Sequence, residues 1–280
     1  MILRDGRLLS RNAAQKRAPK DIADKQIIAT QSLALDFARL YFRPRSPTQY
    51  HVEGIRKPSE YYHNDPEIHA PILIILIFRS EGILTMPGVF FSDGNMQSPR
   101  TNRLSSDDEF RSLPFEQIYH VGAVDIRSDI TRRRCAEVLV PMALALDGRL
   151  QAVLCRSPAE RATLLYLLGD AAGRWSRIIR VYTEPGIFEN RFAYVDQVAV
   201  SEQGVNFSIH HRYDAQSVKV EGIIVPTDRA WSRGFFLDPA PTGRSIVFRT
   251  PLGPGPYLVE IRIDGCLAYR AVSLIDELPF

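Results

Sequence analysis

The sequence predicts an α+β fold followed by a small all-β part. The α+β core is indicated by apolar, β-branched runs of strand length at residues 72–78 and 137–141, and by a helix start after Ser157. The all-β part is indicated by short alternating runs from residue 187 onward, which are separated by turns rich in proline and glycine. We therefore expect a domain boundary between residues 186 and 187.

Composition is that of a globular chain that can bury a core. Of its 280 residues, 45% are apolar and 24% are charged. The net charge of +3 and the pI of about 8.8 permit a nucleic-acid partner without demanding one. The three cysteines, Cys135, Cys155 and Cys266, show neither disulfide nor metal spacing, which favours a reducing cytoplasm. The basic N-terminus lacks a secretion signal, and no apolar run is long enough to cross a membrane.

The first 40 residues contain basic side chains but no clear periodicity. Arg11, Lys16, Arg17 and Lys20 surround the start of the chain and suit either phosphate attraction or a solvated tail. Residues 21–40 show no clean hydrophobic period, so no element is predicted there.

Residues 41–50 are predicted to form a stiff, non-helical loop. Pro44 and Pro47 bracket Arg45 and Ser46, which restricts φ and pushes the preceding residues toward extended conformations. The loop would present Arg45, whose guanidinium bonds two phosphate oxygens at once and keeps its charge. The alternative is a surface loop with a solvated arginine.

Residues 51–69 are polar and read as a loop. His51, His63 and His69 match no compact ligand spacing, so no metal site is expected. Tyr61 and Tyr62 suit stacking on an aromatic ring of a ligand or anchoring the loop to the core.

The next stretch alternates strand and turn signals. We expect a buried strand at residues 72–78, a turn and strand at 82–91, and a turn at 92–95. A short helix at 106–113 and a strand at 121–126 are predicted before the next apolar run.

Glu137 stands at the head of that run, directly after three arginines. In a strand, Cys135, Glu137 and Leu139 would share one face. A glutamate among apolar neighbours is costly to bury unless another group pairs with it or the chemistry uses it. The alternative is a strand-edge glutamate that turns to water or pairs with one of the arginines.

The following elements are set by local signals. A turn at residues 147–148, strands at 150–154 and 178–182, and a helix between them are expected. Ser157 is the predicted N-cap, with Pro158 at N1 and Glu160 at N3, and four leucines between 164 and 168 are expected to form its apolar face. In the all-β part, strands are expected near 206–210, 217–225, 245–249, 256–263 and 267–274, with His210 and His211 as a strand pair.

Three motifs together resemble a known family. The Pro-Arg-Ser-Pro loop after an aromatic pair, the segment at residues 90–95 and the Arg-Arg-x-Ala-Glu-x-Leu-Val strand occur in this order in the DarT single-stranded DNA ADP-ribosyltransferases. These are the toxins of DarT–DarG toxin–antitoxin pairs. The resemblance covers roughly residues 2–185 and implies an ADP-ribosyltransferase-like split β-sheet core with flanking helices.

The resemblance assigns roles to the residues singled out above. It implies NAD as ADP-ribose donor without a metal, with Arg45 and Glu137 catalytic and facing each other across the cofactor pocket. Arg45, Tyr50, Tyr61 and Tyr62 would contact NAD, and Asn95, Arg132 and Arg133 would contact single-stranded DNA. Residues 1–6 resemble only the tail of the helix in the family's N-terminal His-Ile-x-Asn-Leu-like element, which helps hold NAD. Three explanations stay open: the true start lies upstream, NAD is held differently, or the activity is weak.

The resemblance implies a DarG-like macrodomain antitoxin and a cytoplasmic enzyme without a membrane partner. Two alternatives stay open: a transferase that modifies RNA or protein, and a nucleic-acid-binding module that retains the fold with weak catalysis. Residues 187–280 resemble no family that assigns them a role.

Overall fold

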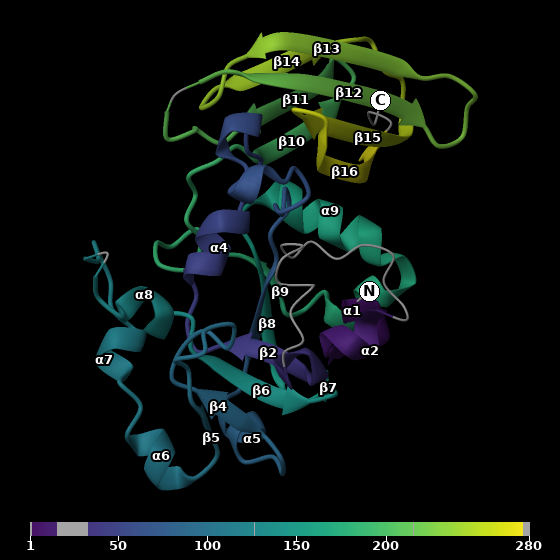
Figure 1. The fold of residues 1–280 in the computed structure, drawn as a ribbon. Helices are drawn as coiled ribbons and strands as arrows, with labels where there is room; N and C mark the ends of the chain where they lie inside the picture. Colours follow the sequence, from purple (N-terminus) through teal and green to yellow (C-terminus); the bar gives the residue numbers. More distant parts are fainter. Residues whose placement is uncertain (1, 16–32, 126, 215, 277–280) are drawn as a thin grey trace. The chain divides into compact units, whose positions relative to one another are not determined.

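A computed structural model describes residues 2–15, 33–125, 127–214 and 216–276 (Figure 1). The chain forms two compact units, which are described separately. Unit 1 contains Met1–Val52, Ile77–Gln151 and Gly186–Glu189, and unit 2 contains Glu53–Leu76, Ala152–Pro185 and Asn190–Phe280. The chain passes between the units within β3 (Ile75–Phe78) and β8 (Leu150–Cys155).

Unit 1 is built on a four-stranded antiparallel sheet in the order β2-β6-β4-β5, with a second pair formed by β1 and β7. Its strands are β1 (Arg7–Leu9), β2 (Phe37–Tyr41), β4 (Phe90–Ser92), β5 (Arg103–Leu104), β6 (Glu137–Pro141) and β7 (Ala143–Ala145). Its helices are α1 (Ile2–Asp5), α2 (Arg11–Gln15), η1 (Leu33–Asp36), α4 (Pro47–Val52), α5 (Glu81–Leu84), α6 (Asp107–Arg111), α7 (Phe115–Ile118) and α8 (Ile130–Arg133).

Strand β6 lies at the centre of this sheet because its side chains are apolar on both faces. Val138, Leu139 and Val140 are all buried, and β6 pairs with β2 on one side and β4 on the other. Val138 and Val140 pack with Ala38 in one core cluster. The predicted strand is confirmed, and it begins at Glu137.

Unit 2 carries helix α9 (Pro158–Leu168) and most of the β structure. Strand β8 pairs in parallel with β9 (Ile179–Val181), and α9 connects them through η4 (Gly169–Ala171) and α10 (Ala172–Trp175). Two short 3₁₀ helices, η2 (Pro58–Glu60) and η3 (Tyr62–Asn64), lie in its first segment. Helix α9 begins as predicted, because the Ser157 hydroxyl accepts a hydrogen bond from the Glu160 backbone N–H at 3.1 Å.

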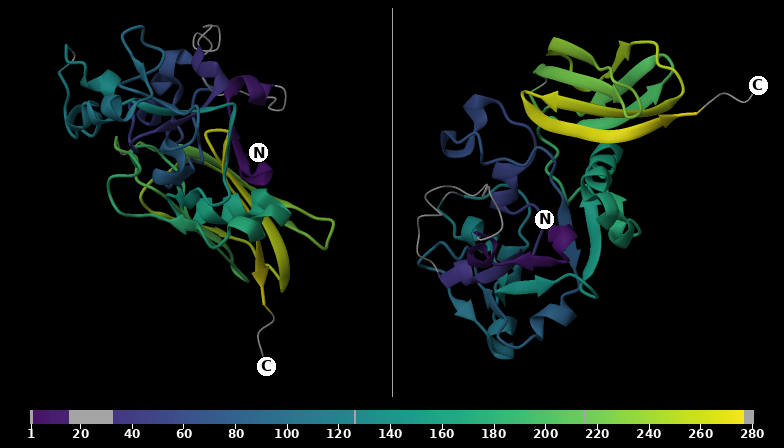
Figure 2. Two further views of the ribbon diagram at one scale, coloured as in Figure 1. Left: turned by 90° about the horizontal axis from the view of Figure 1, so that it is seen from below. Right: turned by 90° about the vertical axis from the view of Figure 1, so that its right-hand side faces the viewer.

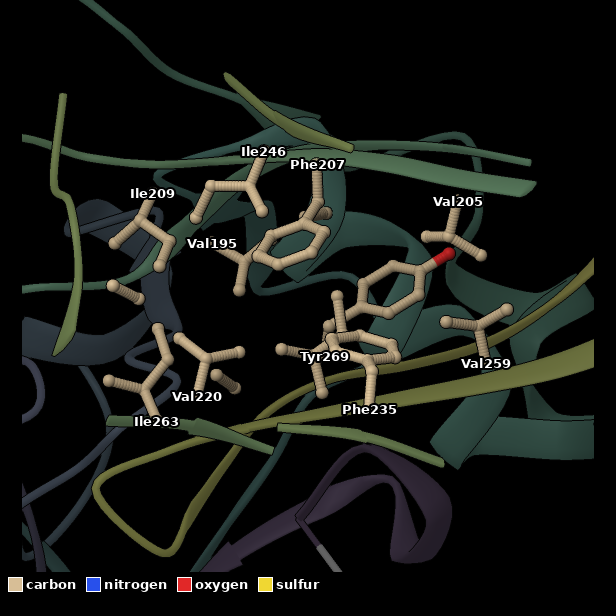
Figure 3. Close-up of a cluster of buried hydrophobic side chains, with 14 of the residues drawn as sticks. Val195, Val205, Phe207, Ile209, Val220, Phe235, Ile246, Val259, Ile263 and Tyr269 are labelled. Carbon is tan, nitrogen blue, oxygen red and sulfur yellow. The ribbon is translucent and has the colours of Figure 1, made fainter. Parts of the chain in front are cut away.

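The C-terminal strands form a two-sheet sandwich, seen edge-on in the right-hand view of Figure 2. One sheet has the order β10-β11-β14 and the other β13-β12-β15-β16. The strands are β10 (Val195–Ser201), β11 (Gly204–Ile209), β12 (Val218–Pro226), β13 (Arg233–Ala240), β14 (Ser245–Arg249), β15 (Gly255–Ile263) and β16 (Cys266–Ile275). Figure 3 shows inward side chains of both sheets, such as Phe207 and Val259, in one shared core.

The predicted fold class is confirmed, including the β-rich C-terminal part. Strands expected at 150–154 and 178–182 are present, as is the helix near 106–113, where Ser106 and Glu109 form a capping box. All five predicted C-terminal strands are present, and β10 and β13 are additional. Within the described residues, no helix combines the length and apolar composition that a bilayer span requires.

Several local expectations were wrong. Residues 121–125 form no strand, and Ile126 lies outside the described residues. The apolar run near residue 72 becomes strand only from Ile75 onward and is half-buried. The expected apolar face of four leucines is not the buried side of helix α9, because only Leu168 of these leucines is buried. Ala159, Glu160 and Thr163 are buried with it, and Glu160 forms an ion pair there while the Thr163 hydroxyl accepts a backbone hydrogen bond.

His210 and His211 are not a strand pair, since β11 ends at Ile209. His210 instead stacks on Tyr194 with ring centroids 4.5 Å apart. In the N-terminal region, Arg11 opens α2, whereas Lys16, Arg17 and Lys20 lie outside the described residues. The sequence of residues 33–41, for which no element was predicted, forms η1 and β2.

Candidate active site

Glu137 is the acidic residue of β6, the central strand of unit 1, and its side chain is buried. Only 1% of its surface is exposed. Its backbone N–H donates to the Ser92 hydroxyl at 2.9 Å, and that hydroxyl donates to the Gly94 carbonyl at 2.7 Å. The carboxylate is therefore attached to a sheet position that is fixed from two sides.

Arg39 of β2 is the partner of this carboxylate. Its Nε donates to Glu137 Oε2 at 2.9 Å and its Nη2 to Oε1 at 2.5 Å, which makes a bidentate pair. The antiparallel register places Tyr41 opposite Glu137 and Arg39 opposite Leu139, so Arg39 reaches the carboxylate diagonally across the sheet. Burial raises the pKa of Glu137, and the charge and hydrogen bonds of Arg39 oppose that rise.

Tyr41 and Cys135 surround the pair with neutral groups. Burial of the phenol end, reinforced by the Glu137 charge, raises the pKa of Tyr41, although 40% of the residue as a whole is exposed. Its hydroxyl donates to Thr48 Oγ1 at 2.9 Å. The same two causes raise the pKa of the Cys135 thiol to about 11. Glu137 and Arg39 are thus the charged groups of this cluster at neutral pH.

Arg45 lies in the predicted loop, but the loop ends earlier than expected. Helix α4 begins at Pro47, because proline suits the first helical position and the Ser46 hydroxyl accepts the Gln49 N–H at 3.2 Å. The expectation that residues 41–50 are wholly non-helical was therefore wrong. Arg45 itself has φ of 54°, a left-handed conformation that is uncommon for a residue with a side chain.

Arg45 pairs with Glu189 rather than standing free. Its Nη2 lies 3.0 Å from Glu189 Oε2, and both residues belong to unit 1. Glu137 and Arg45 are thus members of two different ion pairs.

Arg43 stands beside Arg45 and is held by carbonyl groups. Its Nη1 donates to the carbonyls of Ile118 at 3.1 Å and His120 at 2.6 Å. Burial lowers the pKa of Arg43, and the neighbouring charges of Arg134 and Arg45 add to this, whereas Glu189 opposes them. Arg43 therefore lies near the positive charges of Arg45 and Arg134 and near the negative charge of Glu189.

Asn95 and the two predicted DNA-contacting arginines form one compact turn. The Asn95 side chain accepts the Gln97 N–H at 2.9 Å, and its own N–H donates to the Arg132 carbonyl at 3.0 Å. Arg132, with 8% of its side chain exposed, bonds Asp93 and Asp129, and Arg133 also pairs with Asp93. Both arginines are thus engaged within the protein.

Glycine at position 94 leaves room for the Arg132 side chain. A Cβ added there would lie 2.5 Å from Arg132 Nη1. Burial favours the neutral form of Asp93, yet hydrogen bonds from Asn102 and Arg133 hold its pKa below the ordinary value. The segment that leads from β4 to β5 is therefore fastened to α8, immediately before Glu137.

The predicted tyrosines fall into both units. Tyr50 lies in α4 of unit 1 and is 38% exposed. Tyr61 stacks on His69 with centroids 5.7 Å apart, and Tyr62 stacks on His63 at 4.0 Å, all in unit 2. Among the residues that the structure describes, no group of three or more His, Cys, Asp or Glu side chains is placed to hold a metal ion.

Arg39 and Glu189 were missed by sequence reasoning. The sequence could have indicated a partner for Arg39, since this residue stands in the apolar run Phe-Ala-Arg-Leu-Tyr, where a buried cation requires an acidic partner. Glu189 had none, because it follows a predicted boundary and meets Arg45 across 144 positions of the chain.

Comparison with known proteins decides the family. Residues 1–188 match the family described as "DarT: ssDNA thymidine ADP-ribosyltransferase, DarT". The chain belongs to the DarT family. It is therefore a DarT-type ssDNA thymidine ADP-ribosyltransferase. The resemblance of its three motifs predicted the single-stranded DNA ADP-ribosyltransferase family but not the base, and both Glu137 and Arg45 lie in the matched region.

One solved DarT structure shares the fold of this chain at a TM-score above 0.5, and further DarT structures are similar at lower scores. Thermus sp. 2.9 DarT in complex with ADP-ribosylated ssDNA is 20% identical, with a TM-score of 0.51 over 65% of this chain and 88% of that chain. The same protein in complex with NAD+ is 18% identical, with a TM-score of 0.47 and the same coverage. Thermosipho africanus DarTG in complex with ADP-ribose is 21% identical, with a TM-score of 0.47 over 66% of this chain and 46% of that chain. A comparison with curated protein sequences finds no match.

Proposed function

We propose that this DarT chain transfers ADP-ribose from NAD+ to a thymine base of single-stranded DNA, with Glu137 as the catalytic carboxylate. The observation that carries the assignment is the buried, bidentate Arg39–Glu137 pair at the head of β6. The family match covers this strand. Thermus sp. 2.9 DarT, which shares the fold, has been solved with ADP-ribosylated ssDNA.

The residues present fit NAD+. Arg39 donates to each carboxylate oxygen of Glu137 once, and an ionised carboxylate has about four acceptor positions, so capacity remains for a ribose hydroxyl. Arg45, supported by Arg43, supplies cationic donors for the diphosphate, and Glu189 already provides Arg45 with an anionic oxygen at 3.0 Å. We assign Tyr50, which lies in unit 1 with Arg45, as a further NAD+ contact.

The chemistry follows from the charge of Glu137. When bound, NAD+ supplies a ribose C1′ joined to a cationic nicotinamide leaving group. Glu137 stabilises the positive charge that develops on the ribose as that bond breaks and nicotinamide leaves with the electron pair. Glu137 then accepts the ring N–H proton of thymine as that nitrogen bonds to C1′. Arg39 keeps Glu137 ionised and oriented for both tasks.

The acceptor base must be unpaired, because a paired and stacked base keeps its ring N–H out of reach. We assign Asn95 to the base edge, where an amide both donates and accepts hydrogen bonds. Arg132 and Arg133 serve DNA binding by holding the Asn95 turn against α8, which their bonds to Asp93 and Asp129 support.

We further propose that the chain is the toxin of a DarT–DarG pair, with a DarG-like macrodomain antitoxin as its partner, and that it acts in the cytoplasm. Family membership supports the pairing, and the buried thiols of Cys135 and Cys155, which form no disulfide, suit a reducing compartment. We assign residues 1–186 to the transferase domain and 187–280 to a small all-β domain, because the family match ends at residue 188.

The test is mass spectrometry of oligonucleotides incubated with NAD+ and protein. Wild type is expected to add the mass of ADP-ribose to single-stranded DNA that contains thymine, and not to an oligonucleotide without it. Glu137→Ala is expected to lower the yield by about 100-fold or more, since a charge that acts on the transition state is lost. The exposed Glu81→Ala is the control. Equal adduct from wild type and Glu137→Ala would remove Glu137 from the mechanism, and adducts only on RNA or protein would move the activity to another acceptor.

A further inference from the structure

The segment that follows the family match folds back onto the Arg45 loop. Residues Gly186–Glu189 belong to unit 1, although they follow a long passage of the chain through unit 2. Glu189 is the first residue beyond the matched region, and it forms the ion pair with Arg45 at 3.0 Å. Its side chain is 10% exposed and that of Arg45 is 37% exposed, so the carboxylate is the more deeply buried partner.

A second connection runs through Gln49. Its side-chain oxygen accepts the Arg45 backbone N–H at 2.8 Å, and its side-chain nitrogen donates to the Ile187 carbonyl at 2.8 Å. The first bond supports Arg45 in its left-handed conformation, which costs free energy for a residue with a Cβ. The segment at 186–189 therefore contacts the guanidinium of Arg45 directly and its backbone through one intermediary.

The charges around this point are unequal. Arg45 and Arg134 are each close enough to Arg43 for their charges to lower its pKa, and the Glu189 carboxylate opposes them there. Three like charges gathered in one place repel each other unless an anion is present. A diphosphate would supply that anion when the donor binds, and Glu189 supplies it beforehand.

We infer that Glu189 is an internal counter-ion, a positioning residue that holds Arg45 in place before the donor binds and releases it to the diphosphate of NAD+. This inference rests on the proposed function, because it takes that diphosphate as the ligand of Arg45. The carboxylate has two opposed effects: it orders the guanidinium, which favours turnover, and it competes with the diphosphate, which weakens binding. Glu189 therefore sets the affinity for the donor.

Two substitutions separate these effects. Glu189→Gln keeps an oxygen that accepts from Arg45 but removes the competing charge, so binding of a diphosphate ligand is expected to tighten roughly three- to tenfold. Glu189→Ala removes the acceptor as well, so Arg45 loses its orientation. This variant is expected to lower kcat for transfer more than Glu189→Gln does.

The measurement is calorimetric titration with ADP-ribose, which carries the diphosphate and is not consumed. Glu81→Gln makes the same charge change at an exposed position of α5 and is expected to bind ADP-ribose as wild type does. If wild type binds and Glu189→Gln, with an unchanged melting temperature, binds no tighter, the inference falls while the proposed function stands. The same holds if Glu81→Gln tightens binding equally, because net charge would then explain the effect.

Two further outcomes distinguish the counter-ion inference from the proposed function. Tighter binding by Glu189→Gln, without any transfer to single-stranded DNA by wild type, would support the counter-ion and overturn the proposed acceptor. Absence of ADP-ribose binding by wild type would overturn both the donor assignment and the inference.

Discussion

At the scale of single residues, the side chain that governs the proposed chemistry is Arg39, although Glu137 performs it. Glu137 is only 1% exposed, so without a cation nearby its neutral form would be favoured. A protonated carboxyl group could not accept the ring N–H proton of thymine. Arg39 supplies two hydrogen bonds and a charge, and it is itself only 26% exposed. The pair thus acts as one unit, in which one member reacts and the other determines its protonation.

Arg39→Gln tests this division of labour. Burial already raises the pKa of Glu137, and removal of the opposing cation raises it further. Because transfer requires the carboxylate, the acidic limb of the pH–rate profile is expected to move to higher pH, with a lower rate at pH 7. Arg79→Gln, at an exposed position, provides the matched control. A profile that stays in place would show that Arg39 is only structural.

The same variant has a stability signature with a defined sign. The folded-state pKa of Glu137 would lie further above its value in the unfolded chain. The contribution of Glu137 to stability is then complete below the unfolded-state pKa and is lost as pH rises through the folded-state pKa. Melting temperatures measured from pH 5 to pH 8 are therefore expected to fall more steeply for Arg39→Gln than for wild type.

At the scale of elements, what could be predicted is what short stretches of sequence encode. The apolar run after Glu137, the Ser157 cap and the short helix near 106–113 are encoded within a few residues, and the structure confirms each. Strand β2 was not predicted, because the residue that stabilises it lies far away in the sequence. Arg39 belongs in an apolar strand only because its partner stands 98 positions later.

The Arg45 loop shows the same limit. Proline can end a helix or begin one, and sequence alone favoured a loop through Pro47, whereas Ser46 and Pro47 in fact start α4. The apolar face predicted for α9 from its leucines was wrong for a related reason. The helix buries Glu160, which pairs with Arg156, and Thr163, which accepts a hydrogen bond from the Arg270 backbone. Both outcomes depend on contacts that are distant in sequence.

Ser157→Ala tests the best-defined element. The Ser157 hydroxyl caps α9 and donates to the Val195 carbonyl at 2.7 Å, with none of its surface exposed. Its loss leaves a helix-end N–H and a strand carbonyl without this partner, so stability is expected to fall by about 1–2 kcal/mol. Urea unfolding measures this against Ser217→Ala at an exposed position. An equal midpoint for both variants would show that the cap contributes nothing.

At the scale of the whole molecule, charge is divided between the two sequence regions. Residues 187–280 contain 9 Lys and Arg and 11 Asp and Glu, a net charge of −2, which leaves +5 for residues 1–186. Attraction for a polyanion therefore resides in the first region, and the sandwich has the wrong sign for a general nucleic-acid module.

Unit 2 suggests a different use for the sandwich. The segment Glu53–Leu76, which follows the Arg45 loop in the chain, folds together with the C-terminal strands. Arg212 joins the two, since its Nη2 donates to both oxygens of Glu60 at 2.9 Å while its Nε donates to Asp214 at 2.9 Å. The sandwich thus serves as the support on which this segment is ordered.

Arg212→Met tests that support. Arg212 is fully buried, and its removal leaves Glu60 and Asp214 without their shared cation, so stability is expected to fall by about 3 kcal/mol. Arg229→Met, at a half-exposed position, removes the same charge and is expected to change little. Since Glu60 would no longer be held, trypsin is expected to cleave after Arg56 faster in Arg212→Met than in this control. Equal cleavage rates and equal unfolding midpoints for the two variants would mean that the segment is ordered without the sandwich.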